Sequence, residues 1–264
     1  MKKFTEMKHV GQRITALTAY DYPTARLLDE SGVDIILVGD SVGMVVLGYE
    51  DTTRVTLAEM LHHTRAAARG VKRALLVADL PIHTYDTPEQ AIATARELVQ
   101  AGAQAVKLEG GASHARRIEA IVQSGIPVIA HIGMLPQSVR EEGGYRLKGR
   151  SQSEVEQLIQ DAHAVEKAGA FAVVLEIVKS DAAKQITNAI GIPTIGIGSG
   201  INCDGQILVT HDLIGLFPWF TPKFVSPAAH VAQDIRRAVT AFIERTRNGS
   251  PLSNRPGGEV SPGP

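Results

Sequence analysis

The sequence predicts an α/β fold, a single closed (β/α)8 TIM barrel. Short apolar runs rich in β-branched residues recur eight times, and helical patterns separate them at intervals of roughly 25–35 residues. Repeated strand–helix units indicate a parallel sheet, and eight such units fit a barrel. The length of 264 residues suits one barrel, and no linker rich in Pro, Gly, Ser or charge interrupts residues 1–245. We therefore expect one domain over residues 1–247, rather than two smaller ones.

The first half of the chain supplies four strands, predicted at residues 13–20, 34–39, 74–78 and 105–111. Four helices follow them, predicted at residues 23–31, 56–69, 87–102 and 113–124. The second strand reads DIILVG, a continuous apolar run that is typical of a strand buried on both faces. The second helix begins with Thr56 as N-cap and Glu59 as its capping-box partner, with Gly70 as C-cap. The third begins with Thr87 before a proline.

The second half supplies four more strands, predicted at residues 127–132, 171–177, 193–200 and 205–209. Its helices are predicted at residues 153–168, 180–190 and 227–245. Long loops are expected at residues 42–54, 135–150 and 215–226. From residue 248 the chain consists mainly of Gly, Pro and Ser, so we expect residues 248–264 to form a disordered tail.

A doubly wound open sheet is the alternative to the barrel. A dinucleotide-binding sheet would carry G-x-G-x-x-G after its first strand, and this chain has no such motif there. Gly196, Gly198 and Gly200 lie late in the chain and lack that spacing. Glycines at the end of a barrel strand more often permit a close backbone approach, so the barrel is favoured.

Composition excludes several classes of function. The net charge of −1 gives no electrostatic basis for binding nucleic acid or an anionic membrane surface. No apolar run approaches the ~20 residues of a membrane span, and the N-terminal MKKFTEMKHVGQR has no apolar signal-peptide core. The single cysteine, Cys203, excludes an internal disulfide and fits a reducing cytoplasm. We expect its thiol to pack rather than react.

Polar side chains stand at most of the predicted strand ends: Asp40, Ser41, Asp79, Lys107, Glu109, His131, Glu176 and Ser199. In a (β/α)8 barrel the strand C-termini meet at one rim, which holds the active site. Lys107 and Glu109 lie two residues apart on one strand, so they point the same way. Four carboxylates at one rim repel one another, and a single lysine does not balance them. Such oxygen ligands suit Mg²⁺, and no Cys/His cluster indicates zinc.

Taken singly, these residues also have structural interpretations. Lys107 and Glu109 can form a buried ion pair at the end of a strand. Asp40 and Asp79 can each cap the following helix. His131 can be a hydrogen-bonded core histidine. The convergence of all of them on one rim is what favours a site.

The residue types at the rim indicate separate roles. Asp40, Asp79 and Glu109 would bind a metal, and Lys107 would bind an anion. Glu176 follows four apolar residues, and burial raises the pKa of a carboxyl group, which suits a general base. This chemistry fits a 2-oxo acid, whose carboxylate and keto oxygens chelate one Mg²⁺ and whose neighbouring C–H becomes acidic.

Ordered motifs across nearly the whole chain resemble one family. They are TAYD (18–21), LVGDS (37–41), ADLP (78–81), VKLEGG (106–111), HIG (131–133), PQS (136–138), GGY (143–145), IPTIGIGSG (192–200) and DGQILVTHD (204–212). Up to about residue 245 the sequence resembles the ketopantoate (3-methyl-2-oxobutanoate) hydroxymethyltransferases. The resemblance implies a barrel of the phosphoenolpyruvate/pyruvate type. It also implies transfer of a hydroxymethyl group from 5,10-methylenetetrahydrofolate to 3-methyl-2-oxobutanoate through a Mg-stabilised enolate, giving 2-dehydropantoate for pantothenate.

The same resemblance implies roles for individual residues. The metal ligands would be Asp40, Asp79 and Glu109; the 2-oxo acid contacts would be Asp40, Ser41, Asp79 and Lys107; Glu176 would accept the proton from C3 and His131 would face the substrate. The family further implies Mg²⁺ as cofactor and a cytoplasmic homodecamer, to which the apolar loop at residues 216–220 would contribute.

Three segments depart from the family pattern. Residues 82–86 read IHTYD, Ser199 stands where Ala is usual, and residues 217–219 read FPW.

Two other functions remain open from the residues alone. A lyase or mutase of the same superfamily would usually carry a reactive cysteine in a mobile loop, and Cys203 lies elsewhere. A non-catalytic barrel would have no reason to gather these acids at its rim.

Overall fold

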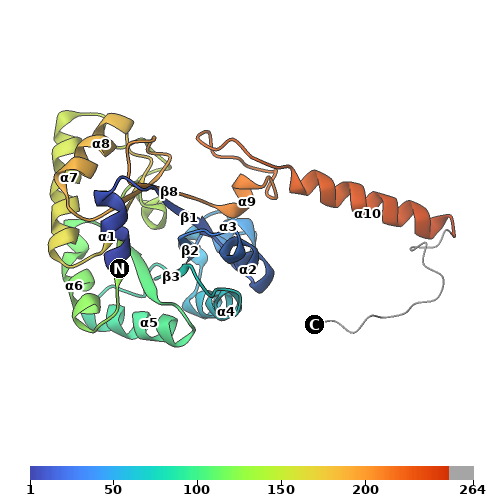
Figure 1. Cartoon of the computed structure of the whole chain (residues 1–264), viewed down its shortest axis with the longest axis horizontal. Helices are drawn as coiled ribbons and strands as arrows, with labels where there is room; N and C mark the ends of the chain where they lie inside the picture. Colours follow the sequence, from blue (N-terminus) through green and yellow to red (C-terminus); the bar gives the residue numbers. More distant parts are fainter. Residues whose placement is uncertain (250–264) are drawn as a thin grey trace. The chain divides into compact units, whose positions relative to one another are not determined.

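The computed structural model describes residues 1–249, and its core is a closed eight-stranded barrel (Figure 1). Every strand runs parallel to its neighbours, and β1 pairs with β8 to close the sheet. The strands are β1 Ile14–Thr18, β2 Ile35–Val38, β3 Leu75–Asp79, β4 Ala105–Glu109, β5 Val128–Gly133, β6 Ala172–Glu176, β7 Thr194–Ile197 and β8 Gly205–Leu208. The predicted barrel is confirmed, and the open-sheet alternative is wrong.

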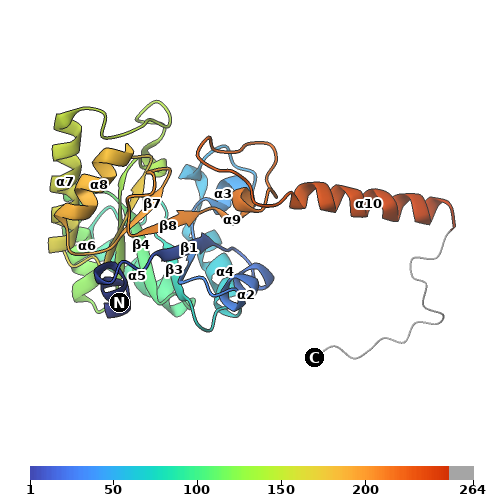
Figure 2. The same ribbon diagram turned by 45° about the horizontal axis from the view of Figure 1, so that its top comes forward.

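Helices alternate with the strands, and Figure 2 shows α6, α7 and α8 on the outer side of the barrel. The α-helices are α1 Lys2–His9, α2 Tyr22–Glu30, α3 Val42–Val45, α4 Leu57–Ala68, α5 Pro88–Gln100, α6 Ala115–Gln123, α7 Gln152–Lys167, α8 Ser180–Ala189, α9 Thr210–Leu213 and α10 Val231–Arg247. Short 3-10 helices are η1 Thr52–Arg54, η2 Ala112–His114 and η3 Pro136–Ser138. The expected loops at 42–54 and 135–150 thus contain helical turns, because backbone groups at the barrel rim pair locally.

The predicted caps are largely present. Thr56 and Glu59 form the capping box of α4, and Thr87 caps α5. Gly70 is not the C-cap of α4, because that position belongs to Arg69. A Cβ atom at Gly70 would lie 2.7 Å from a backbone oxygen of α2, so the glycine serves close packing of α2 on α4.

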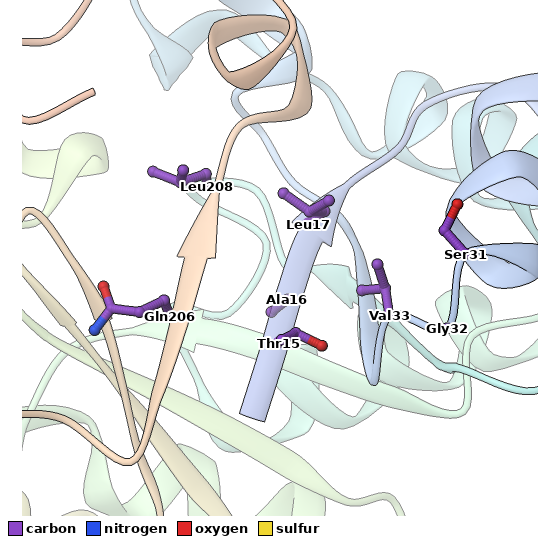
Figure 3. A pocket seen from close by; sticks show the side chains of 8 residues that line it. All are labelled: Thr15, Ala16, Leu17, Ser31, Gly32, Val33, Gln206 and Leu208. Atoms are coloured by element: carbon purple, nitrogen blue, oxygen red, sulfur yellow. The ribbon is translucent and has the colours of Figure 1, made fainter. Parts of the chain in front are cut away.

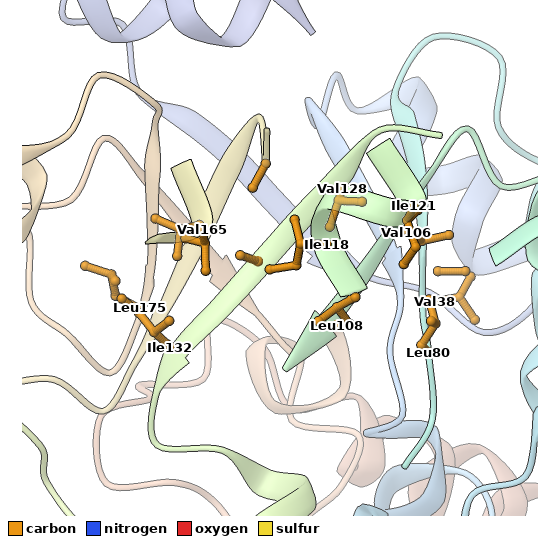
Figure 4. Close-up of a cluster of buried hydrophobic side chains, with 14 of the residues drawn as sticks. Val38, Leu80, Val106, Leu108, Ile118, Ile121, Val128, Ile132, Val165 and Leu175 are labelled. Carbon is orange, nitrogen blue, oxygen red and sulfur yellow. The ribbon is translucent and has the colours of Figure 1, made fainter. Parts of the chain in front are cut away.

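Side chains alternate between two cores with the period of two that strands impose. One cluster fills the barrel interior and includes Ile35, Val77, Ala105, Ile129 and Val174. The residues between them face the helices and form the larger outer cluster, part of which appears in Figure 4. The inward register continues two residues at a time to the C-terminal strand ends, where polar residues replace apolar ones.

Helix α1 was not predicted, and it packs against the N-terminal end of the strands. Phe4 joins the interior cluster, and its ring stacks on Phe171 with centroids 5.9 Å apart. Lys8 donates to the backbone oxygens of Thr187 and Ile192 at 2.8 and 3.1 Å. It also pairs with Asp204 at 3.0 Å. This helix therefore covers the end of the barrel opposite to the polar rim.

The chain divides into two compact units after Thr210. The second contains most of α9, a connecting segment and α10, which begins at Val231 instead of residue 227. The expectation of one domain over residues 1–247 stays a prediction, and residues 250–264 of the expected tail lie outside the described residues. Within residues 1–249, no helix combines the length and apolarity needed to cross a membrane.

Candidate active site

The seven residues expected to act gather at the C-terminal ends of β2 to β6. Asp40 and Ser41 follow β2, Asp79 closes β3, Lys107 and Glu109 lie on β4, His131 lies on β5 and Glu176 closes β6. Most are buried despite their charge: Asp40, Asp79, Lys107, Glu109 and His131 are each 5% exposed or less. Asp79, Lys107, Glu109, His131 and Glu176 continue the inward register of their strands, and Asp40 joins them from the turn after β2, where its backbone N–H donates to Asp79. The structure therefore brings the group together at one end of the barrel.

Lys107 and Asp79 form the closest ion pair of this group. Lys107 Nζ lies 2.6 Å from Asp79 Oδ1, and the backbone N–H of Asp40 donates to the other oxygen at 3.2 Å. Burial lowers the pKa of Lys107, but the charges of Asp79, Glu109 and Asp40 outweigh it and hold that pKa above its usual value. Lys107 is therefore a permanent cation at neutral pH.

The carboxylates retain an excess of negative charge. Burial holds the pKa of Asp40 well above its usual value, and the neighbouring charges of Asp79 and Glu109 raise it further. The pKa of Asp79 is also raised, by burial first, although Lys107 lowers it. A raised carboxyl pKa means that the group lacks positive partners in proportion to its burial.

His131 lies between two of these acids. Its Nδ1 is 3.5 Å from Glu109 Oε1, and its Nε2 is 3.3 Å from Glu176 Oε2. Neither contact has good hydrogen-bond geometry, and both ring nitrogens are buried. Burial and Lys107 lower the pKa of His131, but the two carboxylates raise it to about 9. The ring is therefore an imidazolium at neutral pH in this arrangement.

Gln137 connects the acids that Lys107 does not reach directly. Its side-chain amide donates to Asp40 Oδ2 at 2.8 Å and to the backbone oxygen of Leu80 at 3.0 Å. Its backbone N–H donates to Glu109 Oε2 at 3.0 Å. The Tyr85 hydroxyl donates to the amide oxygen of Gln137. Glu109 Oε1 is buried and has no hydrogen-bond partner.

The group holds more acidic than basic side chains. Four acids (Asp40, Asp79, Glu109, Glu176) share the rim with two basic side chains, Lys107 and His131. With every acid ionised and both bases charged, two negative charges are unbalanced, which is the charge of one divalent cation. The raised pKa of Asp40 means that this acid binds a proton more readily when no cation is present. Throughout residues 1–249, no three His, Cys, Asp or Glu side chains are arranged as they stand to hold a metal. Lys107 and Gln137 engage one oxygen each of Asp79 and Asp40.

Ser41 is held by a side-chain contact, and Glu176 is held by the backbone around it. The hydroxyl groups of Ser41 and Tyr20 lie 2.8 Å apart, and His63 Nδ1 lies 2.7 Å from the backbone oxygen of Tyr20. Ile177, directly after Glu176, has φ +49°, a conformation that costs a β-branched residue on the order of 1–3 kcal/mol. A Cβ at Gly133 would lie 2.5 Å from the backbone oxygen of Glu176, so β5 must carry glycine there.

Ser199 does not join the charged group. Its hydroxyl donates to the backbone oxygen of Leu175 at 2.7 Å and accepts from the N–H of Val178 at 3.0 Å. The extra oxygen at this departure from the family pattern therefore ties β7 to the end of β6.

A surface pocket of about 380 Å³ also lies apart from the rim (Figure 3). Its lining includes Thr15, Leu17 and Gln206, and none of the site residues.

The amino-acid sequence matches a known protein family. The family model described as ketopantoate hydroxymethyltransferase matches residues 1–251. The chain belongs to the ketopantoate hydroxymethyltransferase family. A relative in Syntrophus aciditrophicus, named 3-methyl-2-oxobutanoate hydroxymethyltransferase, is 51% identical and covers 92% of this chain and 90% of its own. One of the same name in Acetivibrio thermocellus is 52% identical and covers 93% and 88%.

Solved structures share this barrel fold. A 2,3-dimethylmalate lyase, described as a PEP mutase/isocitrate lyase superfamily member, superposes with TM-score 0.63 at 18% identity and covers 99% of this chain and 91% of its own. A phosphonopyruvate hydrolase, solved with oxalate and Mg²⁺, gives TM-score 0.62 at 15% identity and covers 94% and 87%. At these identities the likenesses show the fold, a (β/α)8 barrel.

Sequence reasoning missed Gln137, Tyr85 and Tyr20 as site residues. Gln137 lies in the PQS motif and Tyr20 in TAYD, two segments that carry the family resemblance. The motifs themselves indicate no role for either side chain. Tyr85 lay in the unusual 82–86 segment. A polar residue within an expected loop carries no sequence signal of burial, and Gln137 is only 5% exposed.

Proposed function

We propose that this chain transfers a hydroxymethyl group from 5,10-methylenetetrahydrofolate to 3-methyl-2-oxobutanoate, forming 2-dehydropantoate in pantothenate biosynthesis. Family membership over residues 1–251 and relatives of that name support the reaction. The observation that carries the mechanism is the cluster at the strand ends, where three buried acids, one lysine and one histidine lie beside the partly exposed Glu176.

Asp40, Asp79 and Glu109 would hold a divalent metal, which we propose to be Mg²⁺. Glu109 Oε1, which makes no hydrogen bond, and the surplus of acidic over basic side chains fit a divalent cation with oxygen ligands. The related phosphonopyruvate hydrolase with oxalate and Mg²⁺ supports the choice of metal. Such an ion, when bound, supplies Lewis acidity to the keto group and so acidifies the neighbouring C3–H bond.

Lys107 and Ser41 would hold the carboxylate of the 2-oxo acid, with Asp40 and Asp79 also facing the substrate. The raised pKa of Lys107 keeps the cation charged when an anion arrives. Tyr20 lies 2.8 Å from Ser41 Oγ and limits how that hydroxyl can turn. Burial of the group excludes water, which strengthens the attraction between lysine and carboxylate.

Glu176 would accept the proton from C3. It is the least enclosed of the four acids, with 14% of its side chain exposed, so it faces the space that a substrate would enter. The C3 carbon would then form a bond to the methylene carbon of the folate, both C–N bonds of that carbon would break, and water would supply the hydroxyl group. Tetrahydrofolate would leave with one proton that came from C3 and one from water. His131, 3.3 Å from Glu176 Oε2, would keep the carboxylate oriented for the proton transfer.

We also propose a cytoplasmic homo-oligomer, a decamer by family resemblance. A single buried cysteine is compatible with a reducing compartment. Trp219 and Phe220 are 77% and 57% exposed, as expected for residues that another subunit covers. Ile235, Val239 and Phe242 add an exposed apolar face along α10.

Proton exchange tests the chemistry separately from the folate. We expect the C3 proton of 3-methyl-2-oxobutanoate to exchange into D₂O in the presence of Mg²⁺ and enzyme, and to do so without folate. Glu176→Gln should lower the exchange rate by about 100-fold or more, the contribution of a general base. Exchange at the wild-type rate would exclude Glu176 as the base. Absence of turnover by the wild-type enzyme with both substrates would exclude the reaction itself.

A further inference from the structure

Gln137 is placed to control two of the proposed metal ligands at once. Its amide N–H group meets Asp40 Oδ2, and its backbone N–H meets Glu109 Oε2. Each contact engages one oxygen of a carboxylate. Glu109 Oε1 makes no hydrogen bond, although His131 Nδ1 lies 3.5 Å from it, and among the described residues no hydrogen bond engages Asp40 Oδ1. These two oxygens are the ones available to a cation.

The orientation of the Gln137 amide follows from its neighbours. The NH₂ group faces the carboxylate of Asp40 and the backbone oxygen of Leu80, which both only accept hydrogen bonds. A flipped amide would turn its oxygen toward two acceptors. The amide oxygen therefore faces Tyr85, whose buried hydroxyl donates to it. Three hydrogen bonds thus hold this side chain in one position.

Tyr85 is buried, so its hydroxyl group is enclosed where it meets the amide oxygen of Gln137. The segment that carries Tyr85 lies between β3 and α5, whereas Gln137 lies on η3 after β5. The Tyr85–Gln137 bond therefore joins two rim segments that are 52 residues apart in the sequence.

We propose that Gln137, held by Tyr85, is a positioning residue that presents one free oxygen each of Asp40 and Glu109 to the metal. This role rests on the proposed metal site. A neutral amide orients the carboxylates without cancelling their charge, which a lysine at the same place would do. Groups that hydrogen-bond to metal ligands in this way typically contribute 10–100-fold to metal affinity or activity.

Direct metal binding tests the role without relying on turnover. Mn²⁺ can be titrated into the full chain without substrate and followed by electron paramagnetic resonance. Gln137→Met, which removes both donors of the amide, should weaken binding by about 10–100-fold. Tyr85→Phe removes one neutral hydrogen bond, so a loss of about fivefold is expected. Saturating metal should restore most of kcat in Tyr85→Phe, because every ligand is intact.

Matched variants separate positioning from general stability. Tyr49→Phe removes a hydroxyl that donates to Glu59 at 2.6 Å, and Gln104→Met removes an amide that accepts from Leu76 at 3.0 Å. Neither Tyr49 nor Gln104 contacts the site, so metal binding should stay within twofold of wild type. Equal metal affinity in wild type, Gln137→Met and Tyr85→Phe would overturn the positioning role. A wild-type protein that binds no Mn²⁺ would overturn the metal site as well, whereas the transferase reaction is judged by turnover alone.

Discussion

Replacement of Lys107 by methionine should destabilise the protein far more than loss of a surface lysine. Lys107 Nζ lies 2.6 Å from Asp79 Oδ1, with 6% and 2% of the two side chains exposed. At an effective dielectric constant of about 20, that separation corresponds to roughly 6 kcal/mol of attraction. Desolvation offsets part of it, and removing one partner of a buried pair typically costs about 3–5 kcal/mol, because the other charge stays buried.

Two further variants make this prediction specific. Lys107→Met combined with Asp79→Leu removes both charges, so it should recover most of the lost stability, as apolar replacements of buried ion pairs often do. Lys3→Met removes a surface pair with Asp34, 3.1 Å apart but 65% exposed on the lysine side. That pair should contribute less than about 1 kcal/mol.

Urea unfolding in EDTA measures these differences directly. At about 2–4 °C per kcal/mol for a chain of this size, Lys107→Met should also lower Tm by roughly 6–20 °C. Lys107→Met and the double variant should both lose activity. The double variant should therefore regain stability without regaining activity. A loss under 1 kcal/mol in Lys107→Met, or a double variant no more stable than the single one, would refute the reasoning.

Three more predictions concern regions away from the rim. Asp29→Asn should cost about 1.5–3 kcal/mol at pH 7 in urea unfolding, because its buried carboxylate accepts from the N–H groups of Arg73 and Ala74 at 2.8 Å each. Burial raises the pKa of Asp29, but these bonds lower it overall, so its contribution should disappear as pH falls below the usual value near 3.8. Phe4→Ala should cost about 3–5 kcal/mol in the same assay, because it empties a buried aromatic site in the interior cluster. Cys203 should react with a thiol reagent at least about 100-fold more slowly in the native than in the urea-unfolded protein, because it is fully buried and burial raises its pKa to about 11.

Each of these three has a clear contrary result. An Asp29→Asn difference that persists unchanged at pH 3 would mean that its charge is not what the backbone amides stabilise. An undiminished midpoint in Phe4→Ala would mean that α1 does not help to close the N-terminal end of the barrel. Rapid labelling of native Cys203 would mean that β7 and its surroundings open readily, contrary to the tight packing around the thiol.

Much of the rim was predictable because strand periodicity is local. Lys107 and Glu109 had to share a face once residues 105–109 formed a strand, and the structure places both inward. Barrel closure then brought in residues from other strands without any further sequence information. The expectation that Cys203 packs is confirmed in the same way, because it follows an apolar, glycine-rich strand and is fully buried.

The parts that were missed depend on contacts between distant segments. Gln137 reaches Asp40, which lies 97 residues away, and the sequence near either residue does not encode that contact. Helix α1 lacks a strong apolar stripe of its own, and it is held by Phe171 and by acceptors near residues 187–204. Short helices at 42–45 and 136–138 form in the loops that follow β2 and β5, and local propensity does not predict them.

The choice of a neutral amide at position 137 carries the electrostatic logic of the proposed site. Lys107 forms a direct ion pair with Asp79, and His131 Nδ1 lies 3.5 Å from Glu109 Oε1, whereas Gln137 gives Asp40 and Glu109 neutral N–H donors. These hydrogen bonds orient the two carboxylates without adding positive charge, and burial with the neighbouring acids holds the pKa of Asp40 above its usual value. A second lysine at position 137 would relieve the repulsion and stabilise the metal-free protein. The same change would remove the electrostatic reason for a divalent cation to bind. In the proposed site, a neutral amide would therefore favour metal binding at the expense of the stability of the metal-free protein.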